Sequence, residues 1–99
     1  MIRVREIFFL KFGKAKEARL LLKEGLDLMK KNNAPEVKVL TDFTGRSYRL
    51  IMESDHKDLA DFEKTLKSEL GVSEWQTWYQ KFIPLVNSSE REILSLVEL

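Results

Sequence analysis

Residues 7–10 of this chain read IFFL, four consecutive apolar side chains in the middle of an expected strand. Because neighbouring side chains of a strand point to opposite faces of the sheet, such a run makes both faces apolar. The stretch LIM at residues 50–52 and the stretch ILSLV at residues 93–97 repeat the pattern in two further expected strands. The chain must therefore fold around a sheet that is covered on two sides.

Strand and helix periodicities alternate along the chain. The pattern predicts strands over residues 2–12, 36–43, 47–54 and 89–98, and helices over residues 14–31, 54–71 and 73–82. The turn TGRS at residues 44–47 joins the two middle strands as an antiparallel hairpin. The order βαββα(α)β predicts an α+β fold of ferredoxin-like type, with a four-stranded antiparallel sheet and the helices on one face. At this length we expect a single domain over residues 1–99.

Residue types at the expected helix ends are typical of caps. Ser54 or Asp55 is expected to cap the second helix, and Gly71 is expected to end it. Ser73 and Gln76 match a capping box at the start of the third helix. These signals predict that the second and third helices are separate elements.

Gly25 is an unusual residue for the middle of a helix. Glycine there costs about 1 kcal/mol relative to alanine. Close packing of the first helix on the sheet would explain it, and simple tolerance is the alternative.

The expected helices cover only one face of the sheet. The other face would expose a contiguous apolar patch, which soluble monomers seldom tolerate. Burial of apolar surface is favourable by roughly 25 cal/mol per Å², and a second copy related by two-fold symmetry is the most economical cover. We therefore expect a homodimer in which two sheets pack face to face as a dimeric α+β barrel.

Charge and cysteine content argue against several classes of function. The chain has 17 basic and 16 acidic residues, a formal net charge of +1, so no strong field attracts nucleic acid or a membrane surface. It has no cysteine, which excludes disulfides and thiolate metal sites. With one histidine and scattered carboxylates, the sequence predicts no metal site and no cofactor.

No stretch of the sequence is long and apolar enough to suggest a membrane span. The N-terminal residues MIRVREIFFLKFG alternate polar and apolar side chains and contain no small-residue cleavage site, which is typical of a strand rather than a signal peptide. We therefore expect a cytoplasmic protein with neither a membrane nor a nucleic acid as partner.

Three stretches together resemble the NIPSNAP-like domains of the dimeric α+β barrel superfamily. VREIFFLKFGKAKEA is similar to that family's E-L-R-x-Y-x-L-K-P-G strand and the helix after it. GRSYRLIMESDHKDLADFEKTL is similar to its next strand, an acidic residue and S-L-x-x-F/Y-E. WQTWYQKFIPLVNSSEREIL resembles its closing W-x-x-hydrophobic-x-P-L segment and last strand. The resemblance covers nearly the whole chain.

The chain also departs from the pattern of that family. Glu6 stands where the family usually has Arg, Phe8 where it usually has Tyr, and Phe12 where it has Pro before Gly13. If those polar positions serve a site in relatives, the site is lost or changed here. The resemblance implies a homodimer of undefined activity, because the wider superfamily includes cofactor-free monooxygenases, haem-degrading enzymes and proteins with no known activity.

One face of the third expected helix is aromatic. Trp75, Trp78, Tyr79 and Phe82 follow one another at steps of three, one and three residues, so they share a helical face. One interpretation is that these rings close the core over the sheet. The other is that they wall a ligand pocket between helix and sheet, with the Trp N–H and Tyr O–H groups as its polar points.

Four further residues are candidates for such a pocket. His56, the only histidine, is expected at the start of the second helix, either exposed and without a role or acting as a haem ligand or general base. Glu6, Arg49 and Glu53 are charges within strands, which lie at an edge or rim unless they pair. We expect Arg49 to pair with Glu53 or Glu6. Such a cluster would bind a carboxylate, acidify a substrate or be a simple salt bridge.

These features support two main hypotheses. The first is a small homodimeric protein with a pocket for a small hydrophobic ligand, acting as a binding protein or as an enzyme without cofactor. The alternative is a structural or protein-interaction module with no catalytic activity. Full packing of the aromatic face of the third helix would favour this alternative. A cofactor-free monooxygenase-like enzyme is a further alternative. No H-E-x-x-H, P-loop, Rossmann or G-x-S-x-G motif is present, so catalysis stays an open question.

Overall fold

A computed structural model of the chain describes residues 1–68 and 72–99. Its strands are β1 (Ile2–Leu10), β2 (Lys38–Thr41), β3 (Arg49–His56) and β4 (Val86–Ser95). Its helices are α1 (Ala15–Lys31), α2 (Leu59–Ser68) and α3 (Ser73–Phe82), and a short 3₁₀ helix, η1 (Ile83–Leu85), precedes β4. The predicted end of the second helix at Gly71 lies outside the described residues.

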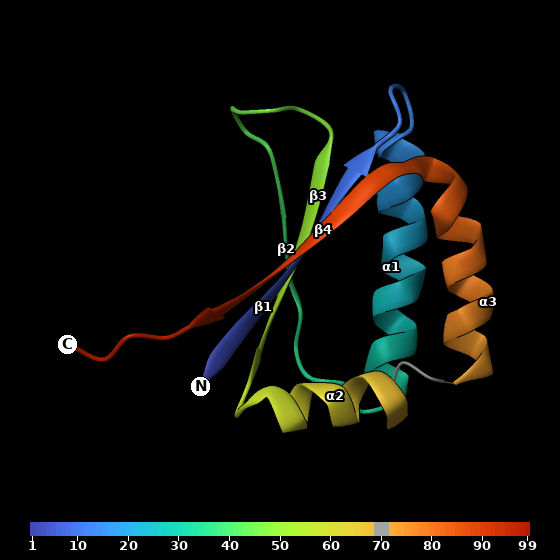
Figure 1. Ribbon diagram of the computed structural model, residues 1–99. Helices are drawn as coiled ribbons and strands as arrows, with labels where there is room; N and C mark the ends of the chain where they lie inside the picture. The colour runs from blue at the N-terminus through green and yellow to red at the C-terminus, as the bar shows by residue number, and fades with distance from the viewer. Residues whose placement is uncertain (69–71) are drawn as a thin grey trace.

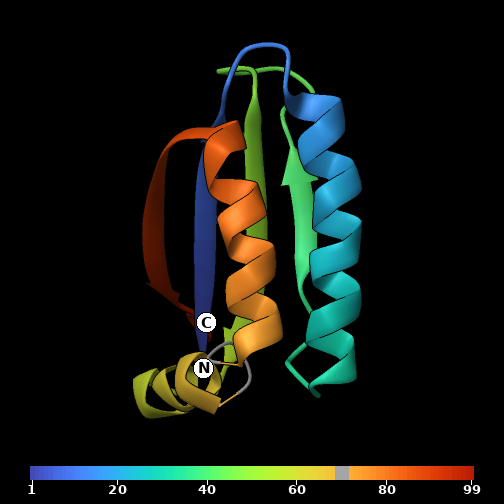
Figure 2. The ribbon, with the colours of Figure 1, turned by 90° about the vertical axis from the view of Figure 1, so that its right-hand side faces the viewer.

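The four strands form one antiparallel sheet in the order β2-β3-β1-β4. This confirms the predicted ferredoxin-like arrangement. Helices α1 and α3 lie side by side over one face of the sheet (Figure 1, Figure 2). Helix α2 lies across the end of the sheet where β3 stops, rather than over its face (Figure 1). Among the described helices, none is long and apolar enough to cross a membrane.

The covered face of the sheet is apolar where α1 and α3 cross it. Phe8 of β1 and Leu50 of β3 are directly opposite each other in the strand register, and both are buried. They pack with buried side chains from the helices and η1, namely Ala18, Leu22, Trp78, Phe82 and Leu85. Burial of this apolar surface holds the helix layer on the sheet.

The pairing of β1 with β4 contains one irregularity. Between Phe9 and Leu10 the register with β4 shifts by one residue, so that Asn87 is the extra residue. A bulge of this kind changes which face every later residue of the strand occupies. It brings Arg91 opposite Glu6.

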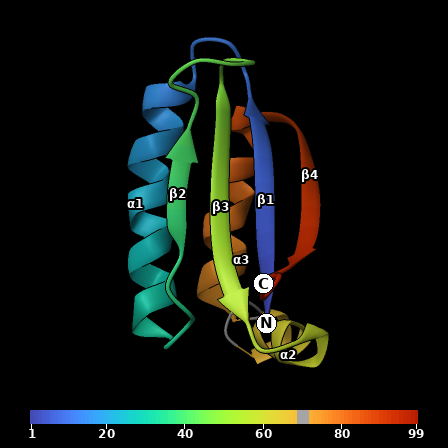
Figure 3. The ribbon, with the colours of Figure 1, turned by 90° about the vertical axis from the view of Figure 1, so that its left-hand side faces the viewer.

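Figure 3 shows the face of the sheet that carries no helix. The strand register places four apolar residues together there: Ile7, Phe9, Leu40 and Ile51. Beside them Arg5 donates hydrogen bonds to Glu53 at 2.7 Å and to Glu92 at 3.3 Å, and Arg3 bonds to Asp55 at 2.8 Å. The prediction of an apolar second face is therefore confirmed for one part of that face and wrong for the other, which ion pairs occupy.

Two of the predicted helix caps are wrong. Strand β3 continues through Ser54 and Asp55, so neither caps α2. Asp58 caps it instead, because its Oδ1 accepts a hydrogen bond at 2.9 Å from the backbone N–H three residues later. Helix α3 begins at Ser73 as predicted, but the cap position is Val72 and makes no side-chain cap hydrogen bond.

Gly25 is explained by close packing, though against α3 rather than the sheet. A Cβ atom added at Gly25 would lie 2.6 Å from two ring atoms of Trp78. The indole Nε1 donates a hydrogen bond at 2.7 Å to the carbonyl oxygen of Leu21, one turn earlier in α1. Trp78 is 3% exposed, which agrees with the interpretation that this ring closes the core.

The substitution Gly25→Ala should therefore destabilise the protein by about 1–3 kcal/mol through overpacking, although alanine favours a helix by up to about 1 kcal/mol. Trp78→Ala should cost about 3–5 kcal/mol. In a Trp78→Leu background the ring is absent, so Gly25→Ala should be neutral or stabilising. Urea unfolding of the single and double variants measures these differences. An equal loss from Gly25→Ala in both backgrounds would contradict the contact.

Candidate functional site

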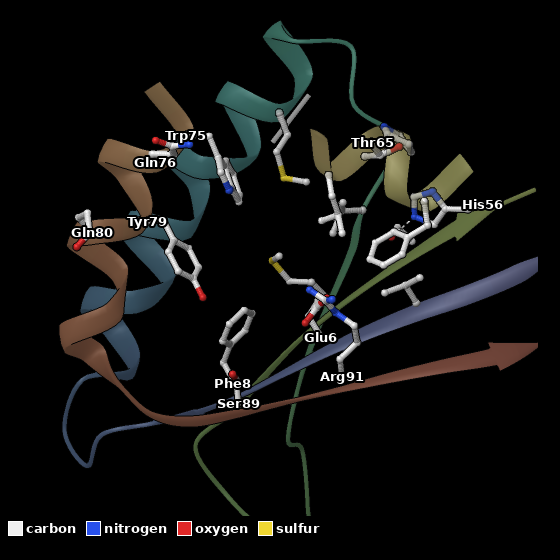
Figure 4. A pocket seen from close by; sticks show the side chains of 18 residues that line it. Glu6, Phe8, His56, Thr65, Trp75, Gln76, Tyr79, Gln80, Ser89 and Arg91 are labelled. Atoms are coloured by element: carbon white, nitrogen blue, oxygen red, sulfur yellow. Dashed lines mark hydrogen bonds and ion pairs between the residues drawn. The ribbon is translucent and has the colours of Figure 1, made fainter. Parts of the chain in front are cut away.

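A cavity of about 480 Å³ lies between the sheet and the helices (Figure 4). Residues of β1, β3 and β4 form one side of it, and residues of α1, α2 and α3 form the other. Most of the lining is apolar, including Val4, Phe8, Met29, Met52, Phe62 and Trp75. Ligand pockets commonly measure roughly 300–1,000 Å³, so the cavity is large enough for a small organic molecule.

His56 is the last residue of β3 and lines the cavity. Its side chain is buried, and its ring centroid lies 5.0 Å from that of Phe62 in α2. Nε2 lies 2.9 Å from the hydroxyl oxygen of Ser54, which is two residues earlier on the same face of the strand. Nδ1 is buried and has no hydrogen-bond partner in residues 1–68 and 72–99. The expectation of an exposed histidine is wrong, because β3 reaches position 56 and α2 covers the ring.

An ion pair between neighbouring strands lies on the sheet side of the cavity. Arg91 of β4 donates from Nε to a carboxylate oxygen of Glu6, its partner in the register with β1. The guanidinium also lies over the ring of Phe62, with Cζ 5.3 Å from the ring centroid. The Glu6 side chain is 22% exposed and that of Arg91 is 46% exposed. The pair therefore forms part of the mouth of the cavity.

Tyr79 brings a polar group to the cavity from the helix side. Its ring points from α3 into the cavity, toward Glu6 and Arg91 (Figure 4). Its hydroxyl group has no hydrogen-bond partner within the part of the chain that the structure describes. In that same part, no three side chains of His, Cys, Asp or Glu gather as a metal site would require. The hydroxyl of Tyr79 is thus a hydrogen-bond donor that faces the cavity.

The aromatic face of α3 is divided between cavity and core. Trp75 and Tyr79 line the cavity, whereas Trp78 and Phe82 belong to the buried core cluster. The rings of Trp75 and Trp78 stack with centroids 4.7 Å apart, and Phe82 lies 5.1 Å from Trp78. The pocket interpretation therefore applies to Trp75 and Tyr79, and the core interpretation applies to Trp78 and Phe82.

The predicted pairing of Arg49 with Glu6 or Glu53 does not form. Arg49 instead bonds to Asp42 at 2.7 Å, and this hydrogen bond lowers the pKa of the Asp42 carboxyl below its ordinary value. Glu53 lies on the uncovered face with Arg5. Strand alternation rules out the pair with Glu6, since it places Glu6 on the opposite face of the sheet from Arg49. The pair with Glu53 does not form because Glu53 bonds to Arg5, its neighbour across the strands, while Arg49 bonds to Asp42. Of these three predicted charges, only Glu6 lines the cavity.

Sequence reasoning did not identify Arg91 or Ser54 as site residues. A usable signal existed for Ser54, because residues two apart on a strand share a face and Ser54 precedes His56 by two. No such signal existed for Arg91, since its position opposite Glu6 depends on the bulge at Asn87. A bulge is set by pairing between distant segments and is not visible in a local pattern.

No protein-family model and no curated protein matches the sequence. Solved structures do match the fold. A NIPSNAP family protein from Agrobacterium tumefaciens has a TM-score of 0.89 at 20% sequence identity, over 98% of this chain and 86% of that one. An uncharacterized NIPSNAP domain protein from Burkholderia xenovorans has a TM-score of 0.88 at 14% identity, over 98% and 95% of the two chains.

A putative antibiotic biosynthesis monooxygenase from Nitrosomonas europaea is also similar, with a TM-score of 0.76 at 10% identity, over 99% of this chain and 100% of that one. The resemblance predicted from the sequence is thereby confirmed at the level of the fold, and the chain has the fold of NIPSNAP domain proteins. Identities of this size establish the fold alone.

The hydrogen bond between Ser54 and His56 gives a test of the site. Ser54→Ala should destabilise the protein by about 1–3 kcal/mol, because it leaves the buried Nε2 without a partner. In a His56→Leu background the same change should cost little, since there is no ring nitrogen to satisfy. Urea unfolding of the double-mutant cycle measures the coupling. A cost that is the same in both backgrounds would show that the bond does not form.

Proposed function

We propose that this chain is a NIPSNAP-like protein that binds a small, largely apolar molecule between its sheet and its helices, and that it works as a homodimer. The observation that carries the proposal is the cavity of about 480 Å³, in which an apolar lining surrounds a few polar groups. Small-molecule sites have this composition. Interiors that serve stability alone are packed densely, because unfilled space loses contacts and costs free energy.

Polar groups reach the cavity from the strands β1, β3 and β4 and from helix α3. Glu6 and Arg91 pair on the sheet side, Ser54 and His56 bond to each other on β3, and Tyr79 points in from α3. Much of the remaining lining is apolar. A bound molecule would place its polar group against one of these points and bury its apolar part against the rings, which would fix its orientation.

The uncovered face of the sheet supports the proposed homodimer. Its apolar patch of Ile7, Phe9, Leu40 and Ile51 has no helix over it. The charges beside the patch are already paired within the chain, and a paired charge is less costly to bury than a single one. A second copy placed by a two-fold axis would cover the patch of each chain with the patch of the other.

A second candidate function is oxygenation of the bound molecule without a cofactor. Structures named as antibiotic biosynthesis monooxygenases share the fold, with TM-scores of 0.76 and 0.77. His56 lines the cavity, and a histidine there could accept a proton from a bound phenol. Consumption of dioxygen by the protein in the presence of a bound phenol would favour this candidate. Binding without turnover would favour a binding protein.

A side chain that fills the cavity should weaken ligand binding. Leu66 of α2 lines the cavity, and Leu66→Trp should weaken binding of a neutral solvatochromic dye such as Nile red by at least about tenfold. Leu59→Trp is the matched control, because Leu59 lies on the same helix, is 58% exposed and is outside the cavity. Dye emission measures binding, and thermal unfolding checks that each variant is folded. Equal weakening by both variants would contradict the proposed pocket, and no binding by the unmodified protein would favour a structural module.

The dimer is tested by two adjacent residues of β2. Sedimentation equilibrium should give about twice the chain mass of 11.7 kDa. Leu40→Glu should raise the dimer dissociation constant at least about a hundredfold, because two-fold symmetry would bury the unpaired charge twice. Val39→Glu is the control, since Val39 is 40% and Leu40 is 44% exposed but their side chains point to opposite faces. A monomeric unmodified protein, or equal effects of the two variants, would contradict the proposed interface.

A further inference from the structure

Arg91 uses only part of its hydrogen-bonding capacity. It donates from Nε to Glu6, and the face of its guanidinium lies over Phe62. Neither Nη atom has a hydrogen-bond partner among the residues that the structure describes. Those two atoms form the edge of a guanidinium that binds a carboxylate through two parallel hydrogen bonds. The cavity mouth therefore contains an oriented cation with a free binding edge.

Arg5, on the other face of the same sheet, shows the complete form of this arrangement. It donates from Nε to Glu53 at 2.7 Å and from Nη1 to Glu92 at 3.3 Å. One guanidinium there serves two carboxylates from the two neighbouring strands. Arg91 has its Nε partner, Glu6, but within residues 1–68 and 72–99 it has no counterpart of the second carboxylate. A carboxylate supplied by a bound molecule would complete the same arrangement inside the cavity.

The contacts that Arg91 already makes prepare it for this role. The bond from Nε to Glu6 and the packing over Phe62 hold the plane of the guanidinium in one orientation. A group that is held before binding loses less conformational entropy when it binds. Glu6 also offsets the charge of Arg91, so recognition of an anion would depend more on directed hydrogen bonds from the Nη atoms than on net charge.

Tyr79 supplies a second donor from the opposite side of the cavity. Its hydroxyl points toward the Glu6–Arg91 pair and has no partner among the described residues (Figure 4). The aromatic rings that line the cavity, among them Trp75 and Phe62, provide flat apolar surface beside these donors. Offset stacking on such rings favours a flat ring in the bound molecule.

We infer that the molecule bound in this cavity is a small aromatic carboxylic acid, held through its carboxylate by the Nη atoms of Arg91 and the hydroxyl of Tyr79. The inference rests on the proposed function, because it names the class of molecule that the same site takes. Glu6 and Phe62 act as positioning residues that hold the guanidinium.

Three probes of nearly identical shape test the inference. They are 2-naphthoate, 2-acetylnaphthalene and 2-isopropylnaphthalene, which carry a carboxylate, a neutral carbonyl or no oxygen on the same ring system. Binding is followed by isothermal titration calorimetry with the full chain. We expect 2-naphthoate to bind at least about tenfold more tightly than 2-isopropylnaphthalene, because only the carboxylate accepts charge-assisted hydrogen bonds.

Variants assign the preference to particular residues. Arg91→Met should remove the preference for 2-naphthoate and leave the affinity for 2-isopropylnaphthalene unchanged, and Tyr79→Phe should weaken 2-naphthoate alone. Arg46→Met is the matched control, because the Arg46 guanidinium also lies over a phenylalanine ring, 4.8 Å from Phe9, but outside the cavity. It should preserve the preference. Arg91→Lys keeps the positive charge but lacks the planar guanidinium edge, so it should retain only part of the preference for 2-naphthoate.

The outcomes separate the two proposals. Binding of 2-isopropylnaphthalene or 2-acetylnaphthalene as tightly as 2-naphthoate would overturn the inference and leave the proposed pocket standing. A preference for 2-naphthoate that survives Arg91→Met in a folded variant would also overturn it. If none of the three probes binds the unmodified protein, and Nile red does not bind either, the proposed function fails together with the inference that rests on it.

Discussion

The contact of Trp78 with Gly25 sets the spacing of the helix layer, and the cavity depends on that spacing. Because glycine has no Cβ, the indole ring lies against the backbone of α1 and its Nε1 bonds to the carbonyl of Leu21 at 2.7 Å. Helix α3 is thereby held against α1 as well as against the sheet. The next aromatic residues of α3, Trp75 and Tyr79, are then carried over the part of the sheet where the cavity lies. A tighter or looser contact between the helices would change the volume beneath them.

Helix α2 contributes to the site in a different way. It lies across the end of the sheet, and Phe62 on its inner side contacts both His56 and Arg91. A helix over the face of the sheet at this place would fill the space with its own side chains. Helix α2 closes the end of the sheet instead (Figure 1). The cavity then lies above the residues of β1 and β3 on that face, among them Phe8 and His56. The polar groups of the cavity are held in a largely apolar environment, where a hydrogen bond to a molecule of the proposed kind would be stronger than in water.

Much of the fold could be predicted from periodicity, because the strands and helices of this chain have clear local patterns. The start of α3 at Ser73 and the burial of Trp78 followed from such patterns. The site could be predicted only in part. Three candidates named from local patterns do line the cavity, namely Trp75, Tyr79 and Glu6. The burial of His56 could not be predicted in this way, because it depends on how far β3 continues and where α2 packs. Those features are decided by contacts between distant segments, which outweigh local preference.

The single extra residue in β4 has a consequence for the charge of the cavity. If β4 paired with β1 without the bulge at Asn87, each residue after it would move by one position and Glu90, not Arg91, would stand opposite Glu6. Two carboxylates would then face each other at the mouth, and the site would repel anions. A shift of the β4 register by one residue would thus reverse the sign of the charge that faces Glu6. Under the proposed function, the charge preference of the cavity therefore depends on the register of β4 as well as on which residues line the cavity.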